Sequence, residues 1–144
     1  MMDSVSDLMQ QAMAHHERGE LEDASGFYKR ALEREPEHAD ALHLTGVIAH
    51  QQGRNEEAVA LITRAIAKSP GEPAFYNNIG MALMALGRVS QAEDAYRQAL
   101  ALAPEFADAL LNLGNLRAGQ ARFAEAVTLL ERAIAVDAAT PQAH

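Results

Sequence analysis

Histidines are the side chains in this sequence best suited to bind a metal, and there are six of them. His15 and His16 are adjacent, while His43 and His50 are seven positions apart and fall on one face of a helix. Converging neutral imidazoles can hold a transition metal, but such a site also needs a third ligand and a supporting carboxylate. These spacings supply neither. We therefore predict groove-lining or partly exposed histidines, with no metal and no cofactor.

Motifs for catalysis are absent from the sequence. It contains no cysteine, which removes thiol nucleophiles and thiolate metal sites. It also has no glycine-rich phosphate loop, no Gly-x-Ser-x-Gly turn and no His-Glu-x-x-His pair. The sequence therefore predicts that the chain is not an enzyme.

Charge and hydropathy narrow the class of partner. The chain has 20 acidic and 12 basic residues, which gives a net charge of -8. Binding to phosphate backbones needs clustered Lys and Arg, whereas here these residues are scattered among acids, so a nucleic-acid partner is not expected. No apolar run approaches the length of a membrane span, and residues 1–7 lack the features of a secretion signal. We predict a cytoplasmic location without membrane insertion.

A period of 34 residues organises the chain. Gly46, Gly80 and Gly114 are separated by 80 - 46 = 34 and 114 - 80 = 34 positions. A fixed period of this size is typical of a solenoid, whose units bury their apolar faces only by stacking. The same interval relates four more series: Ala24, Ala58, Ala92 and Ala126; Ala31, Ala65, Ala99 and Ala133; Pro36, Pro70 and Pro104; and Gly19, Gly53 and Gly87.

Each unit contains two apolar stripes with helical spacing. In the first unit Val5, Leu8 and Ala12 belong to one stripe, and a second stripe starts at Leu21 after Gly19. Residues at i, i+3 and i+4 share a helix face, and glycine ends a helix at low steric cost. The sequence therefore predicts an all-α fold of helix-turn-helix units, with no strands.

This pattern resembles the tetratricopeptide repeat family over nearly the whole chain. The predicted repeats are residues 5–38, 39–72, 73–106 and 107–140, and Ala12, Gly46, Gly80 and Gly114 occupy the small position of the first helix. The fourth repeat departs from the family at two positions. Ala138 replaces the closing proline, and Ala121 replaces the glycine between helices. The resemblance implies one domain over residues 1–144, an α-solenoid of four repeats wound as a right-handed superhelix.

The resemblance assigns peptide binding to a concave groove formed mainly by the first helix of each repeat. Methionine side chains adapt to irregular apolar partners, and amides both donate to and accept from an extended backbone. The predicted groove residues are His43, Leu44, Val47, Asn77, Asn78, Met81, Met84, Leu111, Asn112 and Asn115.

Two binding modes of the family give different expectations. Members that hold the carboxylate of chaperone tails need cations, but Met9, Met13 and Ala74 stand at such positions here, so we do not expect this mode. O-linked N-acetylglucosamine transferases carry a ladder of asparagines, which Asn78 and Asn112 match in two consecutive repeats. An equally good explanation is that a solvent-facing helix simply needed polar residues there.

The end of the chain offers a second surface. Val127, Leu130 and Ile134 are predicted to leave an apolar edge uncovered, because no further helix follows in this sequence. We therefore predict a non-catalytic module that binds a peptide segment or a protein partner in its groove. The alternatives are a self-assembling scaffold that forms a homo-oligomer through uncapped terminal helices, or an N-terminal targeting domain of a larger transferase-type enzyme.

Overall fold

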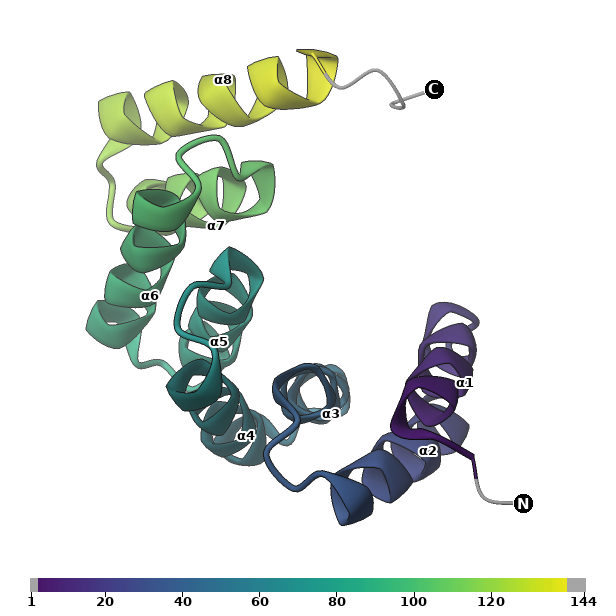
Figure 1. The fold of residues 1–144 in the computed structure, drawn as a ribbon. Coiled ribbons are helices and arrows are strands. Elements are labelled where there is room, and N and C mark those ends of the chain that lie inside the picture. The colour runs from purple at the N-terminus through teal and green to yellow at the C-terminus, as the bar shows by residue number, and fades with distance from the viewer. Residues whose placement is uncertain (1–2, 140–144) are drawn as a thin grey trace. The chain divides into compact units, whose positions relative to one another are not determined.

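The computed structural model describes residues 3–139, and every regular element in that range is an α-helix. The prediction of an all-α repeat fold is confirmed. The chain divides into two compact units, Met1–Pro70 and Gly71–His144, and the helices of each are labelled in Figure 1. The first unit contains α1 (Val5–Glu17), α2 (Leu21–Arg34), α3 (Ala39–Gln51) and α4 (Asn55–Lys68). The second contains α5 (Pro73–Ala85), α6 (Val89–Leu102), α7 (Ala107–Gly119) and α8 (Phe123–Ala139). A single domain over residues 1–144 stays a prediction.

The turns inside the four helix pairs share one backbone geometry. A left-handed residue ends the first helix of each pair: Gly19, Gly53 and Gly87 have φ values of 77°, 80° and 76°. In the fourth pair Ala121 adopts the same conformation with φ 61°. Its N–H donates to the carbonyl of Ala118 at 3.0 Å, and the N–H of Arg122 donates to the carbonyl of Arg117 at 2.9 Å. The turn therefore forms without glycine, at a steric cost to the alanine.

Close approach of the paired helices depends on the small residues of the 34-residue series. A Cβ atom on Gly80 would lie 2.6 Å from Cε1 of Tyr96, which is 2% exposed. A Cβ atom on Gly46 would lie 2.7 Å from Cγ1 of Ile62, and a Cβ atom on Gly114 would lie 2.9 Å from Cδ2 of Leu130. A large side chain of the second helix thus fills the space that the glycine leaves in the first helix.

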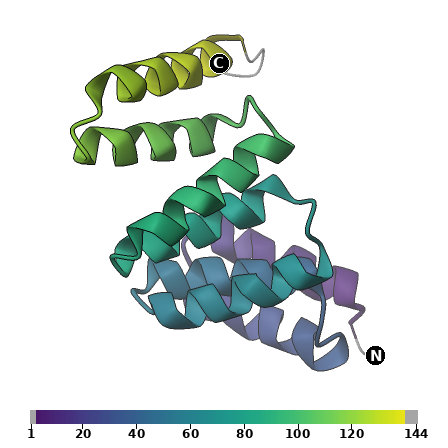
Figure 2. The same cartoon turned by 90° about the vertical axis from the view of Figure 1, so that its left-hand side faces the viewer.

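Each unit has its own buried apolar core. In the first unit Leu8 of α1, Tyr28 of α2 and Ile48 of α3 are fully buried. In the second unit Tyr96 of α6 and Leu110 of α7 are buried in the same way. Figure 2 shows the second unit from another side, with α7 and α8 packed next to each other. No helix in the described part of the chain is long and apolar enough to cross a membrane.

Candidate functional site

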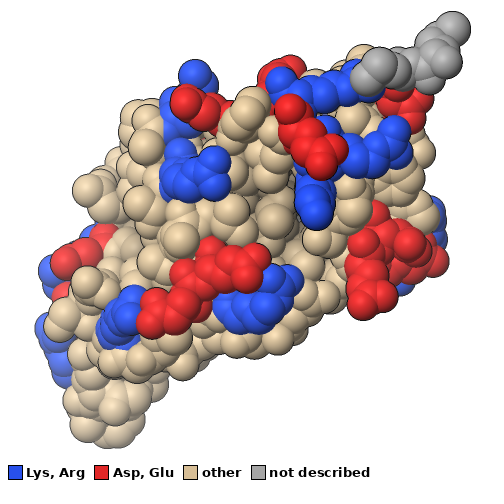
Figure 3. Space-filling model, turned by 90° about the horizontal axis from the view of Figure 1, so that it is seen from below, with Lys and Arg blue, Asp and Glu red and all other residues tan. Residues whose placement is uncertain are grey.

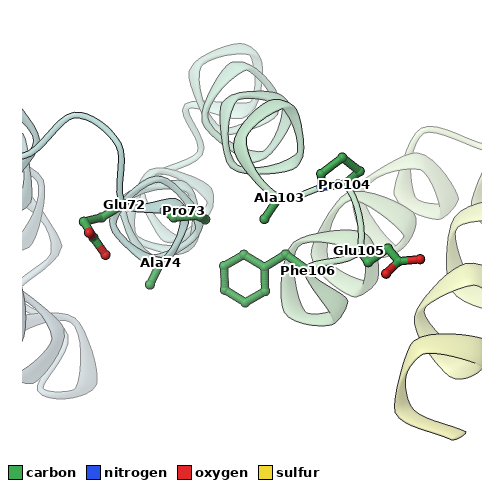
Figure 4. Close-up of a pocket in the computed structure, with 7 residues that line it drawn as sticks. All are labelled: Glu72, Pro73, Ala74, Ala103, Pro104, Glu105 and Phe106. Atoms are coloured by element: carbon green, nitrogen blue, oxygen red, sulfur yellow. The ribbon is translucent and has the colours of Figure 1, made fainter. Parts of the chain in front are cut away.

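A surface hollow of about 850 Å³ lies in the second unit, where α5 begins and where α6 connects to α7. The Phe106 ring points across it toward α5, and the Glu72 and Glu105 carboxylates lie on opposite sides of the ring (Figure 4). The hollow therefore combines apolar walls with two acidic groups. Its lining residues are Glu72, Pro73, Ala74, Ala103, Pro104, Glu105 and Phe106.

Local backbone features shape this hollow. Pro73 is the first residue of α5, where its fixed φ suits a helix start and its missing N–H costs nothing. Phe106 caps α7 with an extended backbone, at φ -71° and ψ 101°. Its N–H donates to the carbonyl of Ala103 at 3.0 Å, which closes the α6–α7 connection into a tight turn. The turn presents the Phe106 ring to the hollow.

Three asparagines lie next along α5 and α7, about one helical turn from the hollow. Asn77 is buried, with 3% of its surface exposed. Its Nδ2 donates to Oδ1 of Asn78 at 3.3 Å, and its Oδ1 accepts from Nδ2 of Asn112 at 2.9 Å. Because the amide of Asn77 both donates and accepts within the protein, it ties α5 to α7 rather than facing a partner.

The other predicted groove residues fall into two sets, one in each unit. In the second unit Asn78, Met81, Met84 and Asn112 are half-buried, Asn115 is exposed, and Leu111 is 46% exposed. In the first unit Leu44 and Val47 of α3 are half-buried, whereas His43 is buried. Leu44 also lines a smaller hollow of about 270 Å³ with Met13, His16, Glu17 and Tyr28.

His43 has the environment of a core residue. Burial lowers the pKa of its imidazole to about 4, although the nearby Asp40 acts in the opposite direction. The side chain is therefore neutral at neutral pH. A neutral histidine in an apolar environment stabilises packing without introducing a charge.

Two of the candidate metal-ligating histidines, His16 and His50, form hydrogen bonds to other side chains. Nε2 of His16 lies 2.9 Å from Oε1 of Gln51, and Nδ1 of His50 lies 2.6 Å from Oδ1 of Asn55. These bonds hold each imidazole against an amide of its own unit. Amide oxygens are hard donors that add little affinity for a transition metal.

His15, Glu20 and Asp23 form the one cluster with metal-ligand spacing among residues 3–139. Arg18 lies inside this cluster, with Nε 3.0 Å from Oε1 of Glu20 and Nη2 3.1 Å from Nδ1 of His15. Hydrogen bonds from His15 and then Arg18 lower the pKa of the Glu20 carboxyl. The guanidinium already supplies the positive charge that a metal ion would bring, so this is an ion-pair cluster.

Arg117 of α7 is a buried cation that was not predicted from the sequence. Its side chain is 4% exposed, and it contacts Glu93 of α6 at 2.8 Å and Glu125 of α8 at 3.0 Å. The hydrogen bond from Arg117 holds the pKa of Glu93 below its usual value. The sequence does carry one signal for it: Arg117 stands 34 residues after Leu83, so the same position is apolar in the preceding repeat. This network joins the last three helices and is structural.

On the face in Figure 3 acidic and basic side chains lie next to each other in most places, and acidic side chains gather at the lower right of the view. Exposed ion pairs such as Arg54 with Glu57, at 2.7 Å, are of this kind. Such a surface offers no basic track for a phosphate backbone.

The predicted apolar edge lies on α8. Val127 is 53% exposed and Ile134 is 68% exposed, and Phe123, which was not among the predicted edge residues, is 64% exposed. Leu130 differs from them, because it is half-buried and packs against Gly114. The edge therefore has three exposed apolar side chains and one that is partly covered.

A sequence profile of the Tetratricopeptide repeat family matches residues 9–73 and 77–144. The chain therefore belongs to the tetratricopeptide repeat family, as the resemblance implied. This repeat is a general scaffold for protein interaction. A comparison with curated protein sequences finds no match.

Solved structures with a similar fold include proteins of several kinds. TTC0263, a thermophilic repeat protein of Thermus thermophilus, superposes with a TM-score of 0.84 at 20% identity, over 92% of this chain and 74% of that one. MamA from Desulfovibrio magneticus RS-1 gives a TM-score of 0.82 at 17% identity, over 96% and 78% of the two chains. Thermobaculum terrenum O-GlcNAc transferase gives a TM-score of 0.77 at 28% identity, over 78% of this chain but 22% of the transferase.

Proposed function

We propose that this chain binds an extended peptide segment of another protein on the α5–α7 face, without catalysis. The α5–α7 face is defined here as the hollow around Phe106 together with Asn78, Leu111, Asn112 and Asn115. The observation that carries the proposal is the hydrogen bond of 2.9 Å between Asn112 and the buried Asn77, which fixes α5 against α7 beside the hollow. A face held in one geometry loses little entropy when a peptide binds.

Apolar anchors of a peptide have two sites on this face. The hollow accepts one side chain against the Phe106 ring, and Leu111 offers a second contact because it is 46% exposed. Burial of apolar surface stabilises a complex by about 25 cal/mol for each Å² removed from water. Aromatic and aliphatic residues are therefore the expected anchors.

Amide groups provide contacts for the peptide backbone. The bond to Asn77 uses Nδ2 of Asn112, so the carbonyl oxygen of Asn112 takes no part in it and can accept from a peptide N–H. Asn115 lies one turn further along α7 and is exposed, which allows its amide both to donate and to accept. The two side chains are spaced to contact successive parts of an extended strand.

Charge complementarity favours a basic segment. Glu72 and Glu105 lie at the hollow, and the net charge of the chain is -8. A cleft with acidic edges attracts cationic partners and raises their association rate. We expect bound segments to carry Lys or Arg next to an apolar residue. The amide groups of this face neither ionise at neutral pH nor act as strong nucleophiles, so binding is the activity proposed.

Selection from a random peptide display library, with the immobilised chain as bait, tests this function. We expect enriched peptides that lose about fivefold affinity to Asn115→Ala and more to Leu111→Asp, since one hydrogen bond contributes about 1 kcal/mol. Thr63→Ala is the matched control, because this exposed hydroxyl of the first unit bonds the Val59 carbonyl of its own helix. Peptides that bind all three variants equally well would contradict the proposal.

The similarity to the O-GlcNAc transferase supports a related role, in which the repeats recruit a protein substrate for a catalytic region. That transferase is 28% identical over 78% of this chain. The same α5–α7 face would then receive the substrate peptide. Retained peptide binding by the chain alone is expected in both cases, and faster modification of a peptide when a catalytic region is joined to the chain is expected only in this one.

A further inference from the structure

One side of α8 carries apolar residues at coiled-coil spacing, of which three are exposed and the fourth, Leu130, is half-buried against Gly114. Phe123, Val127, Leu130 and Ile134 follow one another at intervals of four, three and four, and we call these four residues the α8 strip. This spacing places them along one line of the helix, as in the a and d positions of a heptad. Phe123, Val127 and Ile134 are 64%, 53% and 68% exposed.

Several equivalent positions of other repeats are half-buried, although Val89 of α6, the position equivalent to Phe123, is 37% exposed. In α2, Leu21 and Leu32 stand 102 residues before Phe123 and Ile134. Both leucines are half-buried, and α3 packs on α2. In α6, Leu100 stands 34 residues before Ile134 and is half-buried where α7 packs on α6. The α8 strip is thus a stacking surface of the same kind, in a position where the described helices leave it exposed.

Stacking of α1 from another copy on the α8 strip does not fit the chemistry of α1. In α7, which packs on α6, the apolar residues Ala109 and Leu113 are buried. The positions of α1 equivalent to these, 102 residues earlier, hold Asp7 and Gln11, and both are exposed. Burial of an ionised carboxylate against apolar side chains is strongly unfavourable. A head-to-tail chain of copies is therefore disfavoured.

A second α8 helix fits the strip. We propose that two copies of the chain form a dimer through antiparallel α8 helices, with the α8 strip of each copy facing that of the other. Two-fold symmetry then brings Phe123 of one copy against Ile134 of the second copy, and Val127 against the exposed edge of Leu130, whose side chain also packs against Gly114 of its own copy. Such pairing removes every exposed residue of the strip from water.

Other features of α8 favour the same pairing. Ala124 and Ala135 are exposed beside the strip, and small residues there allow two helices to approach closely. Glu131 is the charged residue nearest the α8 strip. It is exposed, and in the dimer it would lie at the rim of the interface, in contact with water.

The dimer is expected to be weak. Stable interfaces bury about 800 Å² on each partner, and a single pair of short helices provides less than that. We expect a dissociation constant in the micromolar range, so the protein concentration determines whether the chain is a monomer or a dimer.

Sedimentation velocity of the full chain from about 1 to about 500 micromolar tests the dimer, a range that spans the expected dissociation constant. The mean mass should rise from one copy to two copies and go no further. Ile134→Glu should raise the midpoint concentration at least about tenfold, because it places a charge in the seam. Leu102→Glu is the matched control, since Leu102 is an apolar residue of α6 with 45% exposure and is expected to leave the midpoint unchanged.

Cross-linking reports the orientation. The sequence has no cysteine, so a single introduced thiol identifies the contact. Under mild oxidation Val127→Cys should give a disulfide-linked dimer, and Gln11→Cys on α1 should remain monomeric. A single-copy mass at all concentrations, a dimer that Ile134→Glu leaves intact, no cross-link from Val127→Cys, or a cross-link from Gln11→Cys would each overturn the proposal. None of these results depends on peptide binding by the α5–α7 face.

Discussion

The buried guanidinium of Arg117 is held by carboxylates from two neighbouring helices. Glu93 of α6 contacts it at 2.8 Å and Glu125 of α8 at 3.0 Å. A buried charge is tolerated when it is paired, and removal of one partner leaves the other in an apolar environment. The interaction therefore matters most through the cost of breaking it.

Glu93→Gln tests that cost. The substitution keeps the shape of the side chain but removes the charge opposite Arg117, so we expect a loss of about 2 to 3 kcal/mol in the free energy of unfolding. Urea denaturation measures it. Glu57→Gln is the control, because Glu57 and Arg54 form an exposed pair, and its loss should be under about 0.5 kcal/mol. Equal small losses would show that Arg117 does not need Glu93.

His43 predicts a specific pH dependence. Burial lowers the pKa of its imidazole in the folded state to about 4, from the usual histidine value of 6.5. The unfolded state therefore binds more protons between these values, so stability is full above pH 6.5 and falls as the pH decreases toward 4. The loss between about pH 7 and pH 5 should be about 2 kcal/mol.

Denaturant titrations at several pH values measure this slope. His43→Asn places at position 43 the residue that the third repeat has at Asn77, and it removes the titrating group. The variant should be less stable at neutral pH but should show a flatter profile between pH 7 and 5. The same slope in both proteins would contradict the assignment to His43.

Residue contacts were predictable from the sequence when they followed helix spacing, and they were missed when they did not. Glu93 and Arg97 are four residues apart and form the pair expected from that spacing, at 2.8 Å. Arg117 also contacts Glu93, but the two are far apart in sequence and meet only because α6 packs on α7. For the same reason the burial of His43 and Asn77 depends on neighbouring helices rather than on their own positions in a helix.

At the scale of elements, the turn at Ala121 carries strain that glycine would relieve. Ala121 has φ 61°, whereas glycines occupy the left-handed position in the other three turns. A non-glycine residue in this region costs about 1 kcal/mol or more. Ala121→Gly should therefore stabilise the chain by about 0.5 to 1 kcal/mol, because part of the gain is offset by the greater freedom of glycine in the unfolded state.

Thermal unfolding followed by circular dichroism measures this effect. Ala60→Gly is the control, since Ala60 is exposed in the interior of α4 and glycine there should cost about 1 kcal/mol. Opposite signs for the two substitutions would support the strain at Ala121. Destabilisation by both would argue against it.

The close packing of the paired helices also depends on glycines inside helices, which do not adopt the left-handed conformation. Gly80→Ala would place Cβ 2.6 Å from Tyr96, and we expect a loss of about 1 to 3 kcal/mol from overpacking. Gly26 is also inside a helix, α2, but has no atom within 4 Å of an added Cβ. Gly26→Ala should therefore stabilise the chain by about 0.5 to 1 kcal/mol, and chemical denaturation distinguishes the two. Similar values for both would contradict the close approach at Gly80.

Helix positions were predictable because the sequence marks them repeatedly. The predicted repeats begin at the residues where α1, α3, α5 and α7 start: Val5, Ala39, Pro73 and Ala107. The end of the last helix was less well predicted. The position equivalent to the end of α6 at Leu102 is Val136, but α8 continues to Ala139, because Ala138 replaces the proline that would stop it. The Phe106 hollow was missed, since it depends on how the α6–α7 turn meets α5.

At the scale of the whole molecule, both of the proposed binding surfaces belong to the second unit. The second unit has the α5–α7 face, with a hollow, amides and exposed Leu111, and it also has the α8 strip. These surfaces lie on different helices. Peptide binding and pairing of two copies can therefore occur together, and a dimer would present two peptide sites.

Chemical-shift mapping by NMR tests the central claim, peptide binding on the α5–α7 face, most directly. An isotopically labelled chain would be titrated with one peptide obtained from the display selection. We expect the largest shifts at Ala74, Asn78, Leu111, Asn112 and Asn115, with small changes in α2 and α6. Shifts concentrated on α2, α6 or α8, or the absence of localised shifts under saturating peptide, would contradict the claim.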